Sequence, residues 1–237
     1  MSKAFTSVAI LSLGLLAAPT VSAQGQGSRG APAPPPGESR VVHARRIATP
    51  PQIDGRLDEE AYQRPPAASE FIQQEPQGGQ PATERTEVWV YFDDRNIYVS
   101  ARCWDSHPER MVATELRRDQ GNISQGDSFV AIFDTFRDRR NGFYFQTNPL
   151  GALRDQQVVD EGNPNENWNP VWQVRSATFA QGWTTEMAIP FKSLRYSGGG
   201  LQTWGVNFRR SVKWKNETSY LAFIPPAFGN QGIYRVS

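Results

Sequence analysis

Apolar and polar residues alternate along much of this chain, and this alternation predicts short strands and almost no helix. The clearest example is 86–105, where apolar residues recur at every second position on both sides of a polar turn at 93–96. Two alternating runs joined by a short polar turn are typical of an antiparallel hairpin. Further alternating segments follow at 172–176, 183–189, 204–209 and 219–224.

The segment 126–159 differs because its strands are apolar on both faces. Within 129–133, which reads FVAIF, odd-numbered side chains point to one face of a strand and even-numbered ones to the other. A strand covered on both faces belongs near the middle of a buried sheet. Phe143 and Phe145 continue the pattern beyond a charged turn. We therefore expect two or three consecutive antiparallel strands at the centre of the fold.

Many short strands with turns rich in Gly, Pro and Asn predict an all-β fold. We expect a two-sheet antiparallel β-sandwich of jelly-roll or immunoglobulin-like type, with short helical turns. These turns are expected near 57–63 and 111–116, whereas 163–170 is expected to be a loop. A first edge strand is expected at 41–47.

The N-terminal region is not expected to belong to the folded domain. Residues 1–23 combine a basic start, an apolar run at 8–18 and small residues up to Ala23, which is the order of a secretory signal peptide cleaved after Ala23. Residues 24–40 are rich in Gly, Ala and Pro, which is typical of a disordered linker. The folded domain is then 41–237, in a protein exported to the periplasm, the outer membrane or the extracellular medium.

Composition argues against several classes of function. The formal net charge is +1 over 237 residues, which argues against a nucleic-acid partner. Cys103 is the only cysteine, so no disulfide can form within the chain, and the alternation around it predicts a small buried side chain. After the signal peptide, no apolar run is long enough for a transmembrane helix.

Four short motifs occur in a characteristic order along the domain. They are PQIDG with LDEEA at 51–61, VWVYFD with NIYV at 88–99, GDS with IFD at 126–134, and EMAIPF at 186–191. In this order the chain resembles carbohydrate-binding module family 9 over 47–236. More narrowly, FDT at 133–135 with NPLG at 148–151 is similar to the form found at the N-terminus of bacterial outer-membrane proteins with a C-terminal β-barrel.

The resemblance implies a two-sheet sandwich that binds a saccharide or polysaccharide and often calcium. It also implies a C-terminal barrel partner, so the chain is expected to be a piece of a longer protein. Members of the family hold a sugar between two Trp rings, the first of them three residues before the position of Asp127. Ser124 stands there in this chain, and 222–228, the place of the second ring, contains no Trp. The resemblance therefore carries over the fold but not the sugar clamp.

Aromatic residues in polar loops are the candidates for saccharide binding. An aromatic ring stacks on the C–H face of a sugar, while amide and charged side chains bond its hydroxyls. Trp168 lies between Asn167 and Asn169 in a segment too polar for a core, and Trp104 and Trp172 are further candidates. The alternative is that Trp168 caps the end of the sandwich and packs on a neighbouring loop.

Oxygen-bearing side chains near the central strands are candidates for a calcium site. Calcium takes about six to eight oxygen ligands in one place. The sequence has no EF-hand spacing, so the site would be assembled from several loops. The candidate ligands are Asp127, Asp134, Asn148, Asp155 and Asp160.

We therefore expect a non-catalytic carbohydrate-binding domain of an exported bacterial protein, associated with polysaccharide binding or breakdown. The first alternative is a structural domain that packs on an outer-membrane β-barrel and binds no sugar, which Ser124 favours. The second is a glycoside hydrolase, which needs two carboxylates across a cleft, with Glu186 and Asp134 as the candidates. For Glu186 we expect instead a structural pairing with Arg209 or Arg210.

Overall fold

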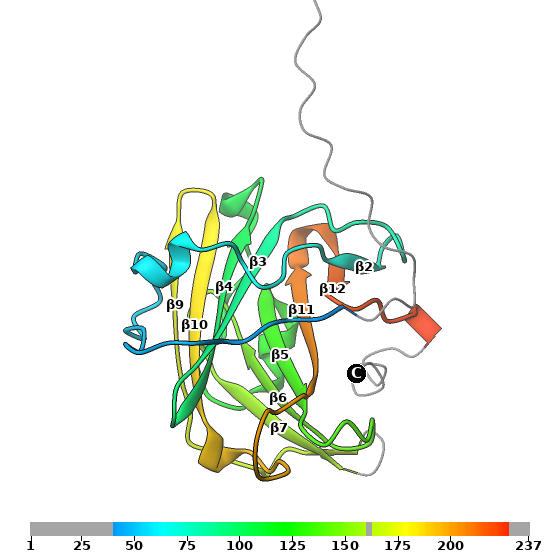
Figure 1. Ribbon diagram of the computed structural model, residues 1–237. Helices are drawn as coiled ribbons and strands as arrows, with labels where there is room; N and C mark the ends of the chain where they lie inside the picture. The colour runs from blue at the N-terminus through cyan, green and yellow to red at the C-terminus, as the bar shows by residue number, and fades with distance from the viewer. Residues whose placement is uncertain (1–39, 160–162, 228–237) are drawn as a thin grey trace, which may run out of the picture. The chain divides into compact units, whose positions relative to one another are not determined.

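The computed structural model describes residues 40–159 and 163–227, which lie in one compact unit (Figure 1). These residues form a sandwich of two β-sheets with short 3₁₀ turns, which confirms the predicted fold class. The predicted signal peptide and residues 24–39 of the predicted linker lie outside the described residues. In the described part of the chain, no helix has the length and apolar character needed to cross a membrane.

Sheet A has five strands and forms one layer of the sandwich (Figure 1). In spatial order they are β1 (Arg45–Arg46), β3 (Thr86–Phe92), β4 (Asn96–Trp104), β10 (Gly182–Pro190) and β9 (Gln173–Phe179). The β1–β3 pair is parallel and the other pairs are antiparallel, so the predicted antiparallel sandwich has one short parallel pair at this edge.

Sheet B has seven strands, all paired antiparallel. In spatial order they are β2 (Ile72–Glu75), β12 (Glu217–Tyr220), β11 (Gly205–Val212), β5 (Ser128–Asp134), β6 (Gly142–Thr147), β7 (Arg154–Val159) and β8 (Asn163–Asn165). The connections carry short 3₁₀ turns, namely η1 (Glu60–Gln63), η2 (Pro108–Arg110), η3 (Gly121–Gln125), η4 (Phe191–Ser193) and η5 (Lys213–Lys215).

β5 is the middle strand of sheet B, and both of its faces are buried. Phe129, Ala131 and Phe133 point into the main core, where they meet side chains of sheet A. The intervening residues point to the opposite face and join a second cluster. That cluster consists of Val130, Ile132, Tyr144, Tyr220 and Ile224. The prediction of a central strand covered on both faces is confirmed.

A charged pair lies inside the core. Arg210 of β11 and Asp127, just before β5, are both fully buried, with Arg210 Nη2 3.8 Å from Asp127 Oδ1. The guanidinium also lies over the ring of Trp183 on β10, 5.1 Å from the centroid, so one cation contacts both sheets. Burial raises the pKa of Asp127, and the neighbouring guanidinium opposes that rise. Cys103 is buried, as predicted.

Glu186 of β10 holds the N-terminal part of the domain against sheet A. Its side chain is fully buried on the outer face of that sheet. Oε2 accepts the backbone N–H groups of Gly55 at 2.8 Å and Asp54 at 3.1 Å, and Oε1 accepts the Tyr62 hydroxyl at 2.7 Å. The predicted pairing of Glu186 with Arg209 or Arg210 is wrong, because those residues lie on β11 in the other sheet.

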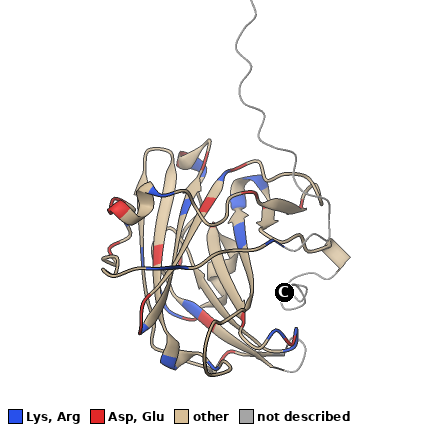
Figure 2. Ribbon diagram, viewed as in Figure 1, with Lys and Arg blue, Asp and Glu red and all other residues tan. Residues whose placement is uncertain are grey.

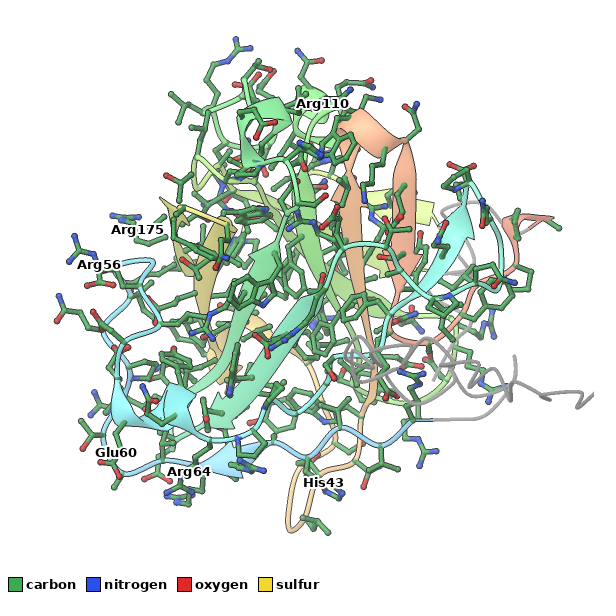
Figure 3. All side chains as sticks on the ribbon, turned by 90° about the horizontal axis from the view of Figure 1, so that it is seen from above. His43, Arg56, Glu60, Arg64, Arg110 and Arg175 are labelled. Atoms are coloured by element: carbon green, nitrogen blue, oxygen red, sulfur yellow. The ribbon has the colours of Figure 1, made fainter. Side chains whose placement is uncertain are left out.

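The segment 51–63 covers the outer face of sheet A (Figure 1). Tyr62 packs edge-on against Trp89 and Tyr91, with ring centroids 5.8 and 6.1 Å apart. Figure 3 shows Arg56, Glu60 and Arg64 at the periphery of this region, where their side chains point away from the sheet. The segment is therefore amphipathic, with an inner aromatic side and an outer charged side.

Gly55 is needed where this segment turns onto the sheet. Its φ of +91° lies in the left-handed region, and an added Cβ would be 2.7 Å from the carbonyl carbon of Ser176. Only glycine combines that backbone conformation with so close an approach. The DG pair of the PQIDG motif thus serves both the turn and the bonds to Glu186.

Some local predictions differ from the structure. The predicted strand at 41–47 is reduced to Arg45–Arg46, and 111–116 is not helical. The helical turns instead lie on either side, at η2 and η3, where Pro108 presets the first turn of η2. The predicted loop at 163–170 begins with β8, because its backbone completes the open edge of β7.

Glu186→Ala is expected to lower the free energy of unfolding by about 2–4 kcal/mol, because one buried and one partly buried amide lose their acceptor. Glu186→Gln should fold well. Its carbonyl can accept both amides and its amide can donate to Tyr62, whose hydroxyl then donates to Ser100, 2.9 Å away. Urea unfolding of both variants measures the difference.

The two variants also differ in their response to pH. Burial raises the pKa of Glu186 from 4.5 to about 7 in the folded protein. The folded state therefore holds a proton that the unfolded state has released, and stability falls as pH rises from 4.5 to about 7. Glu186→Gln should lose less stability between pH 5 and pH 8 than the wild type does. The exposed Glu60→Gln serves as control, and equal slopes for Glu186→Gln and the wild type would contradict the assignment.

Candidate functional site

A pocket of about 340 Å³ lies at the end of the sandwich where β10 ends and β6 begins. Its walls come from sheet B and from two connecting segments. Sheet B contributes one wall, the segment after β8 a second, and the segment 191–195 after β10 a third. The lining residues are Phe143, Gln157, Trp168, Pro170, Val171, Lys192, Ser193, Leu194 and Arg195.

The sheet B wall is set by strand register. Phe143 of β6 pairs with Gln157 of β7, so the two side chains lie on the same face of the sheet. Phe143 is buried in the main core, while Gln157 at the neighbouring position is half-buried. This wall therefore combines an aromatic surface with an amide that can donate and accept hydrogen bonds.

The segment after β10 is fixed in place by its backbone. Pro190 ends the strand, and the Phe191 N–H donates to the Arg95 carbonyl at 2.9 Å. Leu194 is buried, and its N–H closes the turn on the Phe191 carbonyl at 3.0 Å. The Ser193 hydroxyl donates to the carbonyl of Val171 at 3.1 Å, which ties this wall to the segment after β8.

Trp168 lies between the core and the pocket. Its ring centroid is 5.1 Å from that of Phe143 and 5.7 Å from that of Phe145, and the residue is half-buried. The ring packs against the core and also lines the pocket, and its role in saccharide binding stays a prediction. Asn167 and Asn169 are exposed beside it, and neither lines the pocket.

The structure places the other two candidate rings elsewhere. Trp172 is buried against Phe145, with centroids 5.1 Å apart, so its ring offers no exposed face for a sugar. Trp104 is half-buried at the end of β4, and the guanidinium groups of Arg85 and Arg102 lie 5.4 and 5.9 Å from its ring. Its surroundings are thus already occupied by cations of the same chain.

The candidate calcium ligands at the two ends of β5 are far apart. Asp127 precedes the strand and Asp134 ends it, a separation of roughly 20 Å at the usual rise per residue. Asp127 Oδ2 accepts the Val112 N–H at 2.8 Å. Asp134 accepts the N–H groups of Asp138 and Arg139 at 3.2 and 2.8 Å, so it shapes the β5–β6 turn.

The remaining candidate ligands also have partners. Asn148 Oδ1 accepts the N–H groups of Leu150 and Ala152, and Asp155 pairs with a guanidinium. Asp160 lies outside the described residues. No group of three or more His, Cys, Asp or Glu that could hold a metal occurs among 40–159 and 163–227. The described candidates do not fit a shared calcium site, and calcium binding stays a prediction from sequence.

A polar network on the outer face of sheet B was missed by the sequence reasoning. The Tyr144 hydroxyl donates to Gln146 Oε1 at 2.9 Å and accepts from Arg209 at 2.8 Å. Arg154 donates to the Ser124 hydroxyl at 3.1 Å. The position where the family resemblance expects a Trp thus belongs to a hydrogen-bonded network. The alternation of residues along β6 and β7 is the sequence signal for this network, but alternation does not show which side chains form hydrogen bonds with one another.

Arg118 holds the segment that carries Trp168 against β7 through side-chain contacts. Its guanidinium pairs with the buried carboxylate of Asp155 and donates to the Pro170 carbonyl at 3.0 Å. Asp155 Oδ1 also accepts the Trp172 indole N–H at 2.7 Å. Burial raises the pKa of Asp155 from 3.8 to about 6, although the indole and the guanidinium both oppose the rise. One cation therefore supports both the core below the pocket and the pocket wall.

Comparisons with known proteins agree with this architecture. No protein-family model and no curated protein matches the sequence. A candidate carbohydrate-binding protein from Bacteroides uniformis has a TM-score of 0.51 and 13% identity, over 66% of this chain and 77% of its own. This similarity shows a shared fold.

Two structures of a carbohydrate binding module family 9 (CBM9) from Caldicellulosiruptor kristjanssonii are also similar. The complex with glucose has a TM-score of 0.48 and 16% identity, over 75% of this chain and 85% of its own. The complex with cellotriose has a TM-score of 0.48 and 14% identity, over 81% and 90%.

Arg118→Met is expected to destabilise the domain by about 1–3 kcal/mol at pH 8, because it leaves Asp155 buried without its cation while the partly exposed arginine limits the loss. The pKa of Asp155 should rise further in the variant. The destabilisation should therefore be smaller at pH 5, where the carboxyl is protonated. Thermal unfolding at the two pH values measures this. Arg117→Met is the control, because the Arg117 side chain is 71% exposed. If Arg118→Met lost the same free energy of unfolding at both pH values, the result would argue against the pairing of Arg118 with Asp155.

Proposed function

We propose that this chain is a non-catalytic carbohydrate-binding domain and that the pocket at Trp168 is its saccharide site. The observation that carries the proposal is the placement of Trp168, which is supported by the core on one side and lines a pocket on the other. A ring held in this way can stack on the C–H face of a sugar without first having to be ordered. The proposal extends to an exported protein, on the strength of the N-terminal sequence.

The chemistry around Trp168 suits a sugar. The pocket volume falls within the range of small-ligand sites, roughly 300–1,000 Å³. Gln157 and Ser193 supply neutral hydrogen-bonding groups, and Pro170 and Val171 supply apolar surface. A saccharide needs this mixture, because its faces are apolar and its edges carry hydroxyls. The similarity in fold to a candidate carbohydrate-binding protein supports the same reading.

The two carboxylates considered for hydrolysis are placed for other roles. Glu186 is buried on the outer face of sheet A, and Asp134 ends β5 in sheet B. Neither lines the pocket, whose described lining contains no carboxylate. Glycoside hydrolysis requires an acid and a second carboxylate on either side of the bond that breaks. This arrangement favours binding over hydrolysis at the pocket.

A second candidate function is a structural domain that packs on an outer-membrane β-barrel without binding sugar. The observation that favours it is Ser124, whose hydroxyl is bonded within the network of Arg154 and Gln146. That network occupies the place where the resemblance implies a stacking Trp. In this case the domain would show no affinity for any polysaccharide and would copurify with a barrel segment.

Affinity electrophoresis in gels containing soluble polysaccharides tests the first proposal. Trp168→Leu keeps apolar contact with Phe143 but removes the aromatic face, so we expect it to abolish most of the retardation that the wild type shows. A loss of about 1–3 kcal/mol in binding, or roughly 5- to 150-fold in affinity, is expected for one stacking ring. Melting temperatures establish that the variant is folded.

Trp104→Leu is the matched control, because Trp104 is also half-buried but lies outside the pocket. It should be retarded like the wild type. Equal retardation of Trp168→Leu and the wild type would move the site away from the pocket. A wild type that no polysaccharide retards would favour the structural alternative.

A further inference from the structure

We infer that the saccharide bound at this pocket is acidic, with a carboxylate or phosphate group that pairs with Lys192 and Arg195. This inference rests on the proposed function, since it concerns the ligand of the same site. It adds a charge requirement that neither the fold nor Trp168 imposes.

The two cations are available to a ligand. Lys192 lies on η4, whose basic position is visible in Figure 2, and Arg195 follows two residues after that turn ends. Both side chains are exposed and both line the pocket. Within the described residues, neither side chain has a hydrogen-bond or carboxylate partner. Two unpaired cations at one pocket repel each other, and an anion between them would remove that repulsion.

Several other basic residues of the domain are paired with carboxylates. Arg118 binds Asp155, Arg154 binds Glu166, and Lys215 binds Glu84. The fold therefore satisfies many of its cations with its own carboxylates. Lys192 and Arg195 stand apart because they share a concave site whose described lining holds no acid.

The backbone that carries these cations is held on both sides. The Thr135 hydroxyl donates to the Arg195 carbonyl, which joins the segment to the end of β5. The Phe191 N–H bonds Arg95, and the Ser193 hydroxyl bonds Val171. The Cα positions of Lys192 and Arg195 are thus fixed relative to Trp168, and only the side chains must be ordered when a ligand binds. A pre-positioned pair of cations reduces the entropic cost of binding an anion.

The lining divides into parts that match an acidic sugar. The ring of Trp168 suits the apolar face of a pyranose, and Gln157 suits its hydroxyls. Lysine offers a point charge and arginine a planar fork, and both form charge-assisted hydrogen bonds with carboxylate or phosphate oxygens. A neutral sugar would use only the first two parts.

Calorimetric titration of the whole chain with trigalacturonate and with its fully methyl-esterified form tests the inference. The two ligands share a backbone and differ in charge. We expect the acid to bind at least about tenfold more tightly than the ester at low salt, and the ratio to shrink in about 0.5 M NaCl, where charges are screened. Mannose 6-phosphate, with mannose as its neutral counterpart, distinguishes a phosphate ligand from a carboxylate ligand.

The double variant Lys192→Gln, Arg195→Gln should lose about tenfold in affinity for the acid and little for the ester. The control is Arg56→Gln, Lys213→Gln, which removes the same charge at two exposed cations outside the pocket. It should leave both affinities unchanged. An equal loss in the two double variants would mean that net charge alone attracts the ligand, and would overturn the inference.

Other outcomes separate the inference from the proposed function. If acid and ester bind equally and Trp168→Leu weakens both, the site binds saccharides without a charge requirement, and only the inference fails. If inorganic phosphate alone binds as tightly as the sugar acids and Trp168→Leu has no effect, the pocket is an anion site, and both fail. If no member of a panel of acidic and neutral oligosaccharides binds, both fail as well.

Discussion

β5 has no polar face, and the fold has to cover it twice. One face meets sheet A across the main core, and the other packs with Tyr144 and Tyr220 of sheet B and with Ile224 from the segment after β12. Because both faces must be buried, β5 lies in the middle of its sheet, between β11 and β6. The end of β5 then lies next to the segment after β10, where Thr135 bonds Arg195. The position of the pocket thus follows from the burial of one strand.

Local patterns in the sequence predicted the burial of strands and the pairing of strands joined by a short turn, but not the pairing of strands that are distant in sequence. The hairpin at 86–105 and the two-faced strand at 129–133 were predicted correctly, because alternation reports burial directly. The parallel pairing of β1 with β3 was not, since a two-residue strand leaves no periodic signal. The bonds of Glu186 were missed for a related reason. Its partners are mostly backbone amides, and sequence patterns of charge reveal side-chain partners only.

The candidate site could be predicted in part. Trp168 stood out as a single large ring in a polar segment, and the structure places it at the pocket. Gln157, Lys192 and Arg195 were not identified, because Gln157 lies on β7 and the two cations lie in the segment after β10, and these parts of the chain meet only through tertiary packing. Trp172 was a further candidate from sequence, yet its indole N–H donates to the buried Asp155 and its ring joins the core.

The bonds between Glu186 and Gly55 join residues 131 positions apart in the chain. β2 likewise completes its ladder only with β12, near the end of the described residues. During synthesis, which proceeds from the N-terminus, the segment 51–75 therefore emerges long before the strands that hold it. Contacts of such high sequence separation slow folding, because the entropic cost of closing a long loop comes before the contacts can stabilise the chain. The segment 51–75 can therefore complete these contacts only after β10 and β12 have been made.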